Sequence, residues 1–210
     1  MLIKFCNAFT KITAWPVQKL IFRTKIHYAD KTVQGRGVKG PAILVSNHTS
    51  VFDYAVWLFV FFFRTLRFQM AEVLFDKQPL GLFLKAMGGI RVNRNTHDFG
   101  FLHRSQQILD RGGVVGMFPE SRIPKPGEAR PLEFKPSAAL LALNSGVPVI
   151  PVYTDGAYFC RKRAHVVIGT PVYAADLTEE GLTEKENLLR VSEALRARIM
   201  ELERICHEQG

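Results

Sequence analysis

Short β-rich runs alternate with helical patterns along the middle of the chain, and this alternation limits the fold more than any other feature. Apolar and β-branched runs predict strands near residues 42–46, 66–70, 89–92, 114–118, 147–152 and 165–168. Helical patterns lie between them at 53–63, 80–87, 97–111 and 136–145. Strands separated by helices are typical of α/β proteins, so we expect a mixed β-sheet flanked by helices.

The helix ends carry local signals that support this interpretation. Thr96 suits the cap of the third helix and Gly112 its end, while Pro136 suits a first helical position and Gly146 a C-terminal stop. The tail from Thr183 predicts a surface helix docked by one apolar stripe. That stripe consists of Leu188, Val191, Leu195, Ile199 and Leu202.

Composition places the chain among globular proteins. Its 210 residues suit one large domain, or a domain with an appendage. A hydrophobic content of 47% with 22% charged residues excludes a disordered chain. Cys6, Cys160 and Cys206 are too far apart for a disulfide framework or a zinc knuckle, which favours a reducing, cytoplasmic setting.

The N-terminal residues mix large apolar side chains with lysines. We predict that residues 1–35 form an N-terminal amphipathic membrane-associating segment of helices that lie in the membrane interface, with Pro16 kinking or dividing them. The alternative is an amphipathic helix packed on its own domain, which residues 36–210 would form. The longest apolar run, 54–63, is shorter than the ~20 residues that span a bilayer.

Positive charge is concentrated in the middle of the chain. The net charge is +9, and residues 1–31 carry six Lys/Arg against one acid, whereas residues 176–210 carry five against nine. Residues 32–175 therefore hold most of the excess. A basic middle suggests an anionic partner, such as a phosphate ester, nucleic acid or a lipid surface.

The heptapeptide NHTSVFD, residues 47–53, follows an apolar run and places His48 five positions before Asp53. In a continuous helix the two side chains would point ~140° apart, so they meet only if His48 lies on the strand-to-helix loop and Asp53 in the first helical turn. There His48 could accept a proton while Asp53 holds the other ring nitrogen. Ser50 and Asp53 also resemble a capping box, and both interpretations stay open.

Other motifs offer less. GRGVKG, residues 35–40, matches a dinucleotide-binding spacing but precedes its strand and runs into Pro41, so a plain turn is the better interpretation. His48 and Asp53 are too few ligands for a closed zinc site, and we expect no metal and no cofactor.

Four blocks in order bring the pattern together: NHTSVFD, then GGIRVNR at 88–94, FPESR at 118–122 and VPVIPV at 147–152. This order resembles the 1-acylglycerol-3-phosphate acyltransferase family of glycerolipid synthesis. The resemblance covers residues 42–152. It implies an α/β fold with the active site on the strand-to-helix loop of the first block.

The resemblance also implies roles for single residues. His48 matches the family's general base and Asp53 its orienting acid, in the pattern N-H-x-x-x-x-D. Arg94, Glu120 and Arg122 match blocks associated with the acceptor's glycerol phosphate, and Ser121 stands inside the last of these. Pro148 falls in the fourth block, which is linked to the acyl donor or to packing. Glu120 could alternatively position Arg122 or a backbone turn, and the arginines could be ordinary surface charges.

The implied chemistry is direct acyl transfer from acyl-CoA or acyl-ACP, as co-substrate, to the free hydroxyl of a lysophospholipid, most simply 1-acyl-glycerol-3-phosphate. His48 would take the hydroxyl proton as the oxygen attacks the thioester. Backbone N–H groups near the helix start could stabilise the oxyanion. Lys135 could support the phosphate or be a solvated lysine.

Two serines depart from the common family pattern. Ser121 and Ser137 stand where FPEG and FKPG would place glycine, and a serine at a positive φ would carry strain. The departures put the acceptor headgroup in doubt.

Two functional alternatives stay open: an acyltransferase with another lipid acceptor, or a non-catalytic lipid-binding member of the fold. A nucleic-acid-binding module has no recognised motif, so we expect no nucleic acid partner. The expected partners are a lysophospholipid, an acyl donor and the membrane surface, with the protein peripheral or monotopic at the cytoplasmic face.

Overall fold

A mixed sheet forms the centre of the molecule. The computed structural model describes residues 1–93 and 99–209, and within these the sheet has seven strands. In spatial order they are β1 (Lys25–Tyr28), β7 (His165–Ile168), β6 (Val149–Thr154), β2 (Ala42–Ser46), β5 (Val114–Met117), β3 (Leu66–Ala71) and β4 (Ile90–Val92). In the described part of the chain only β6 and β7 pair antiparallel. The predicted mixed α/β fold is confirmed.

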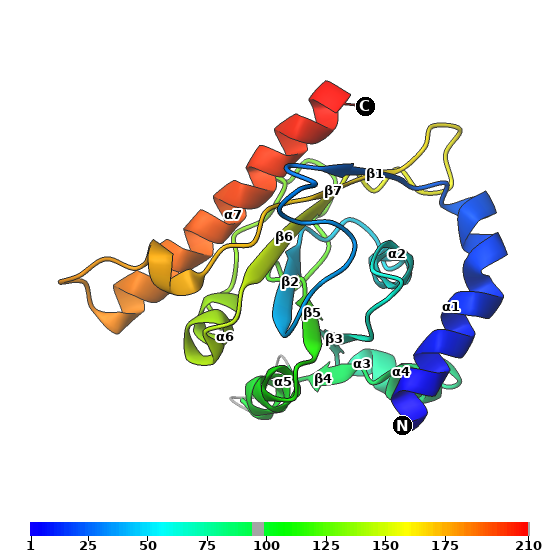
Figure 1. Cartoon of the computed structure of the whole chain (residues 1–210), viewed down its shortest axis with the longest axis horizontal. Helices are drawn as coiled ribbons and strands as arrows, with labels where there is room; N and C mark the ends of the chain where they lie inside the picture. The colour runs from blue at the N-terminus through cyan, green and yellow to red at the C-terminus, as the bar shows by residue number, and fades with distance from the viewer. Residues whose placement is uncertain (94–98, 210) are drawn as a thin grey trace.

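Helices cover both faces of the sheet (Figure 1). On one face lie α5, α6 and α7, and on the other α1, α2, α3 and α4. Their bounds are α1 (Leu2–Ile21), α2 (Asp53–Val60), α3 (Val73–Asp76), α4 (Leu80–Met87), α5 (Gly100–Asp110), α6 (Ser137–Ser145) and α7 (Glu184–Gln209), with a 3-10 turn at Ala174–Leu177. The layers explain why β2 is apolar without alternation: Ala42 and Leu44 enter one core, Ile43 and Val45 the other.

Several predicted ends agree with the structure. α4 occupies the predicted residues, and Gly146 ends α6 in a left-handed conformation (φ 63°) that a glycine adopts without strain. The apolar stripe of α7 is confirmed, with Val191, Leu195 and Ile199 fully buried. The predicted Thr96 cap and the helix start at His97 lie outside the described residues.

Other predicted details differ from the structure. α2 ends at Val60 rather than at 63, because the carbonyl groups of Phe61 and Phe62 turn toward the buried ammonium of Lys11 (3.4 and 3.0 Å). β1 was not predicted as a strand. It lies within the N-terminal segment 1–35, yet it pairs with β7 at the edge of the sheet.

The N-terminal helix α1 packs with its polar side inward. Asn7 and Lys11 are 2% and 3% exposed, and the Asn7 amide donates to the carbonyl oxygen of Met87 (3.0 Å). Burial lowers the pKa of Lys11 to about 8. Phe5 and Phe9 on the opposite side are 66% and 59% exposed. The helix is continuous through Pro16 and is not divided there.

Among the helices of the described residues, none is both long enough and apolar enough to cross a membrane.

Candidate active site

His48 and Asp53 meet at the junction between β2 and α2. β2 ends at Ser46, so His48 lies on the connecting loop, and Asp53 is the first residue of α2. The Nδ1 atom of His48 lies 2.8 Å from Oδ2 of Asp53, whose side chain is fully buried. In a continuous helix the two side chains would point apart, and they meet because His48 lies on the loop before the helix, as the spacing predicted.

Asp53 also holds the loop together. Its Oδ2 accepts the backbone N–H groups of Thr49 (2.7 Å) and Ser50 (3.0 Å), and its Oδ1 accepts the Thr49 hydroxyl (2.9 Å). The carboxylate therefore satisfies N–H groups at the helix start while it binds the imidazole. The two interpretations of NHTSVFD, a base with its acid and a helix-start motif, both describe this geometry.

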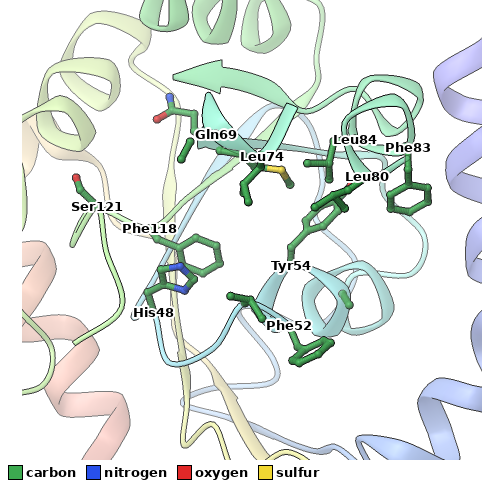
Figure 2. Close-up of a pocket in the computed structure, with 14 residues that line it drawn as sticks. His48, Phe52, Tyr54, Gln69, Leu74, Leu80, Phe83, Leu84, Phe118 and Ser121 are labelled. Atoms are coloured by element: carbon green, nitrogen blue, oxygen red, sulfur yellow. The ribbon is translucent and has the colours of Figure 1, made fainter. Parts of the chain in front are cut away.

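This contact fixes which ring nitrogen of His48 can act. A carboxylate only accepts hydrogen bonds, so Nδ1 carries the hydrogen and the lone pair lies on Nε2. The ring stacks on Phe118, with centroids 4.2 Å apart and planes 12° apart. It borders a cavity, as Figure 2 shows. An imidazole held in this way can accept a proton at Nε2 from a molecule that enters the cavity.

Glu120 lies behind His48. Its side chain is buried, its Oε1 accepts the backbone N–H of His48 (2.7 Å), and its Oε2 accepts that of Leu132 (2.7 Å). Burial raises the pKa of Glu120, and the two N–H donors oppose that shift. Both oxygens are engaged by backbone, which fits the alternative of positioning a turn.

The N–H groups at the start of α2 are also engaged. Those of His48, Thr49 and Ser50 donate to Glu120 or Asp53. They are not free for an oxyanion, so these three positions do not supply the hole that the strand-to-helix loop suggested.

Of the remaining predicted substrate residues, the structure describes Ser121 and Arg122. Ser121 has φ 62°, the left-handed conformation in which a serine is strained. Arg122 is half-exposed and donates two hydrogen bonds to Glu128 (2.6 and 2.8 Å), whose carboxylate raises the pKa of Arg122. Arg94 lies outside the described residues. Ser137 begins α6 and, within the described chain, is not among the positive-φ residues.

Two adjoining cavities meet near His48. The apolar cavity, about 400 Å³, runs from His48 toward α3 and α4 (Figure 2). The second cavity, about 360 Å³, runs from Ser121 toward the start of α6. It is the more polar of the two, with Lys135 in a lining that also holds apolar residues, and we call it the polar cavity. Both share Gln69, Met70, Ala71, Phe118 and Ser121. The apolar cavity is further lined by Val51, Phe52, Tyr54, Ala55, Leu74, Leu80, Phe83 and Leu84.

Comparison with known proteins decides the family. The sequence profile of the Acyltransferase family matches residues 23–155, well over half of the chain and all of the site described above. The chain belongs to the acyltransferase family. The predicted family resemblance is confirmed.

Two curated relatives carry more specific names. A 1-acyl-sn-glycerol-3-phosphate acyltransferase of Bacillus subtilis is 29% identical over 143 residues, which cover 66% of this acyltransferase and 69% of the relative. The chloroplastic 1-acyl-sn-glycerol-3-phosphate acyltransferase BAT2 of Brassica napus is 28% identical over 118 residues, 55% of this chain and 33% of the relative.

A solved structure has the same fold. The 1-acyl-sn-glycerophosphate (LPA) acyltransferase PlsC of Thermotoga maritima superposes with a TM-score of 0.65 at 21% identity. The match covers 96% of this acyltransferase and 79% of that chain.

Sequence reasoning missed the residues that shape the cavities of this acyltransferase. Gln69 lies on β3, and Leu74, Leu80 and Phe83 come from α3 and α4, where each is an ordinary apolar or polar residue of its element. No local pattern marks them. The pairing of β3 with β5, and of β5 with β2, brings them beside Phe118 and His48.

Proposed function

We propose that this acyltransferase transfers an acyl group from acyl-CoA or acyl-ACP to the free hydroxyl of a lysophospholipid, most simply 1-acyl-glycerol-3-phosphate. The two curated relatives, both named 1-acyl-sn-glycerol-3-phosphate acyltransferases, support this acceptor. The observation that carries the proposal is the contact of His48 with Asp53, which occupies Nδ1 and leaves Nε2 as the proton acceptor of a residue that lines the apolar cavity.

The proposed step is a direct displacement. Nε2 of His48 removes the proton of the acceptor hydroxyl while that oxygen forms a bond to the thioester carbonyl carbon. Asp53 stabilises the imidazolium that results. The carbon–sulfur bond then breaks, and the departing thiolate recovers the proton from His48, so that an ester and a free thiol are formed.

The two cavities suit the two parts of the reacting lipids, an acyl chain and a phosphate. The apolar cavity can hold an acyl chain, because Leu74, Leu80 and Leu84 surround it beyond His48. The polar cavity can hold the phosphate, where Lys135 supplies a cation. Arg122 would join it only by leaving Glu128. Glu120 keeps the His48 backbone in place rather than contacting the phosphate.

The proposal includes contact with a membrane surface, at its cytoplasmic face. The inward packing of Asn7 and Lys11 leaves Leu2, Phe5 and Ile12 of α1 exposed on the other side. Apolar side chains on one face of a helix can enter the headgroup region of a bilayer. A lysophospholipid acceptor would be found there.

The test replaces His48 by Ala and follows thiol release from acyl-CoA and acyl-ACP with lysophosphatidic acid as acceptor. We expect turnover to fall by at least a few hundredfold, since a general base contributes about 10²–10⁴. His207→Ala, which removes an exposed histidine on α7, is the control and should keep full activity. Near-normal turnover of the His48 variant at unchanged folding would refute the assigned base. Lipid binding without thiol release in the unaltered protein would favour the non-catalytic alternative.

A further inference from the structure

A third cavity lies away from His48, where the end of α1, the start of β1 and the end of α2 come together. Its volume is about 440 Å³, and we call it the basic cavity. Within the described residues its lining has no member in common with the apolar or the polar cavity. The lining residues that bear on its function are Trp15, Lys19, Arg23, Arg36, Phe59 and Arg163.

Four of these residues are cationic, and the lining includes no carboxylate within the described chain. None of the four forms an ion pair in residues 1–93 and 99–209. Arg36 is the one with a clear structural role, since it donates to the carbonyl oxygens of Phe59 (2.6 Å) and Val60 (2.8 Å) at the end of α2. The helix end offsets part of its charge.

The other three cations have no comparable partner. Arg163 lines the cavity, and its Nε donates a hydrogen bond to the backbone carbonyl oxygen of Arg23 (3.1 Å). This bond keeps the two arginines close. Lys19 extends over the ring of Trp15, 4.7 Å from its centroid. Like charges held together repel, and a bound anion would relieve that repulsion. Guanidinium groups match the oxygens of a phosphate best, because they can donate paired hydrogen bonds.

The setting of the basic cavity indicates where such a phosphate would come from. Trp15 is 47% exposed and Leu20 is 77% exposed, both on the α1 helix that also exposes Phe5 and Phe9. Tryptophan, lysine and arginine beside exposed apolar residues are typical of the region where lipid headgroups lie.

From these observations we propose that the basic cavity binds the phosphate of an anionic phospholipid in the bilayer surface, a different molecule from the lipid that reacts at His48. This rests on the proposed membrane contact of α1. The basic cavity meets α2 at Phe59, whereas the apolar cavity beside His48 meets it no further along than Ala55, about 6 Å away along the helix axis. Binding there would hold the enzyme on the membrane without entering the reaction.

Vesicle flotation tests the proposal with two matched double variants. Vesicles are made of phosphatidylcholine alone or with added phosphatidylglycerol. Lys19→Gln/Arg23→Gln removes two exposed cations of the basic cavity, and Lys185→Gln/Arg204→Gln removes two exposed cations of α7, which packs on the opposite face of the sheet (Figure 1). Both variants lose the same net charge.

We expect the cavity variant to bind the anionic vesicles about 30-fold more weakly, from roughly fivefold per cation near an anionic surface. The α7 variant should bind like the unaltered protein. Lys19→Gln alone should weaken binding to the anionic vesicles about fivefold, which checks the result in a milder variant. Equal losses in both double variants, or no loss in either, would overturn the proposal.

Two further measurements distinguish lipid phosphate from free phosphate, and the lipid-binding site from the proposed acyl transfer. Inorganic phosphate added at constant ionic strength should not release the protein from anionic vesicles, and release would mean that the cavity takes free phosphate rather than lipid. Thiol release with detergent-dispersed lysophosphatidic acid should be unchanged in Lys19→Gln/Arg23→Gln. A protein that floats with anionic vesicles but releases no thiol would contradict the proposed reaction and leave this site standing.

Discussion

Replacement of Glu120 tests whether this buried carboxylate positions His48 or contacts the substrate. Its two oxygens accept the N–H groups of His48 and Leu132 at 2.7 Å each, and its side chain is only 3% exposed. Glu120→Ala leaves both N–H groups without their partner. Each buried unpaired group costs about 1–3 kcal/mol, and because Leu132 is partly exposed we expect a loss of about 2–4 kcal/mol in the free energy of unfolding.

Glu120→Gln is the sharper variant, because it keeps the size of the side chain. An amide has one acceptor oxygen, so its NH₂ group must face one of the two backbone donors. We expect a loss of about 1–2 kcal/mol, from one unsatisfied N–H group. The loop that carries His48 would also shift, and a misplacement of about 1 Å can lower the rate ~100-fold.

Urea unfolding and steady-state thiol release distinguish the two roles. A positioning role predicts lower stability with a fall in kcat and little change in KM for the acceptor. A phosphate-contacting role predicts an altered KM at unchanged stability. The second result would refute the reasoning from the hydrogen bonds of Glu120.

Three further predictions follow from single positions. Ser121→Gly should stabilise the protein by ~0.5 kcal/mol, because glycine adopts the left-handed conformation at this position without strain. Ser137→Gly, at the start of α6, should destabilise it by up to ~1 kcal/mol. Urea unfolding that gives both changes the same sign would contradict this. Burial lowers the pKa of Lys11 from its usual 10.5 to about 8, so between these pH values the unfolded chain binds more protons than the folded one. The free energy of unfolding should therefore rise with pH across this window, on the order of 1–3 kcal/mol. Lys11→Met should lack this rise in thermal unfolding. Ala55→Leu narrows the apolar cavity and should move the preference among acyl donors toward shorter acyl chains. Ala175→Leu, on the exposed 3-10 turn, is the control and should not change it. An unchanged preference in the Ala55 variant would argue that the acyl chain lies elsewhere.

The contact of His48 with Asp53 could be predicted because it is local. A separation of five positions, one strand end and one helix start define it, and each has a sequence signal. The contact of Glu120 with the His48 backbone joins residues 72 positions apart, and nothing in FPESR indicates which donor the carboxylate would find. β1 was missed for a related reason: Lys25 and His27 interrupt its apolar pattern, and an edge strand with one buried residue in four has little periodicity.

The orientation of α1 shows the same limit and gives it a physical cause. The sequence indicates an apolar and a polar side but not which side faces the protein, and for most surface helices the apolar side does. Here the chain just beyond α2 turns carbonyl oxygens toward α1, and the Lys11 ammonium donates to those of Phe61 and Phe62. Once Lys11 is committed inward, Phe5 and Phe9 must face outward. The exposed apolar side of α1 therefore follows from a polar requirement inside the fold, and a membrane surface is the environment in which that exposure would be stable.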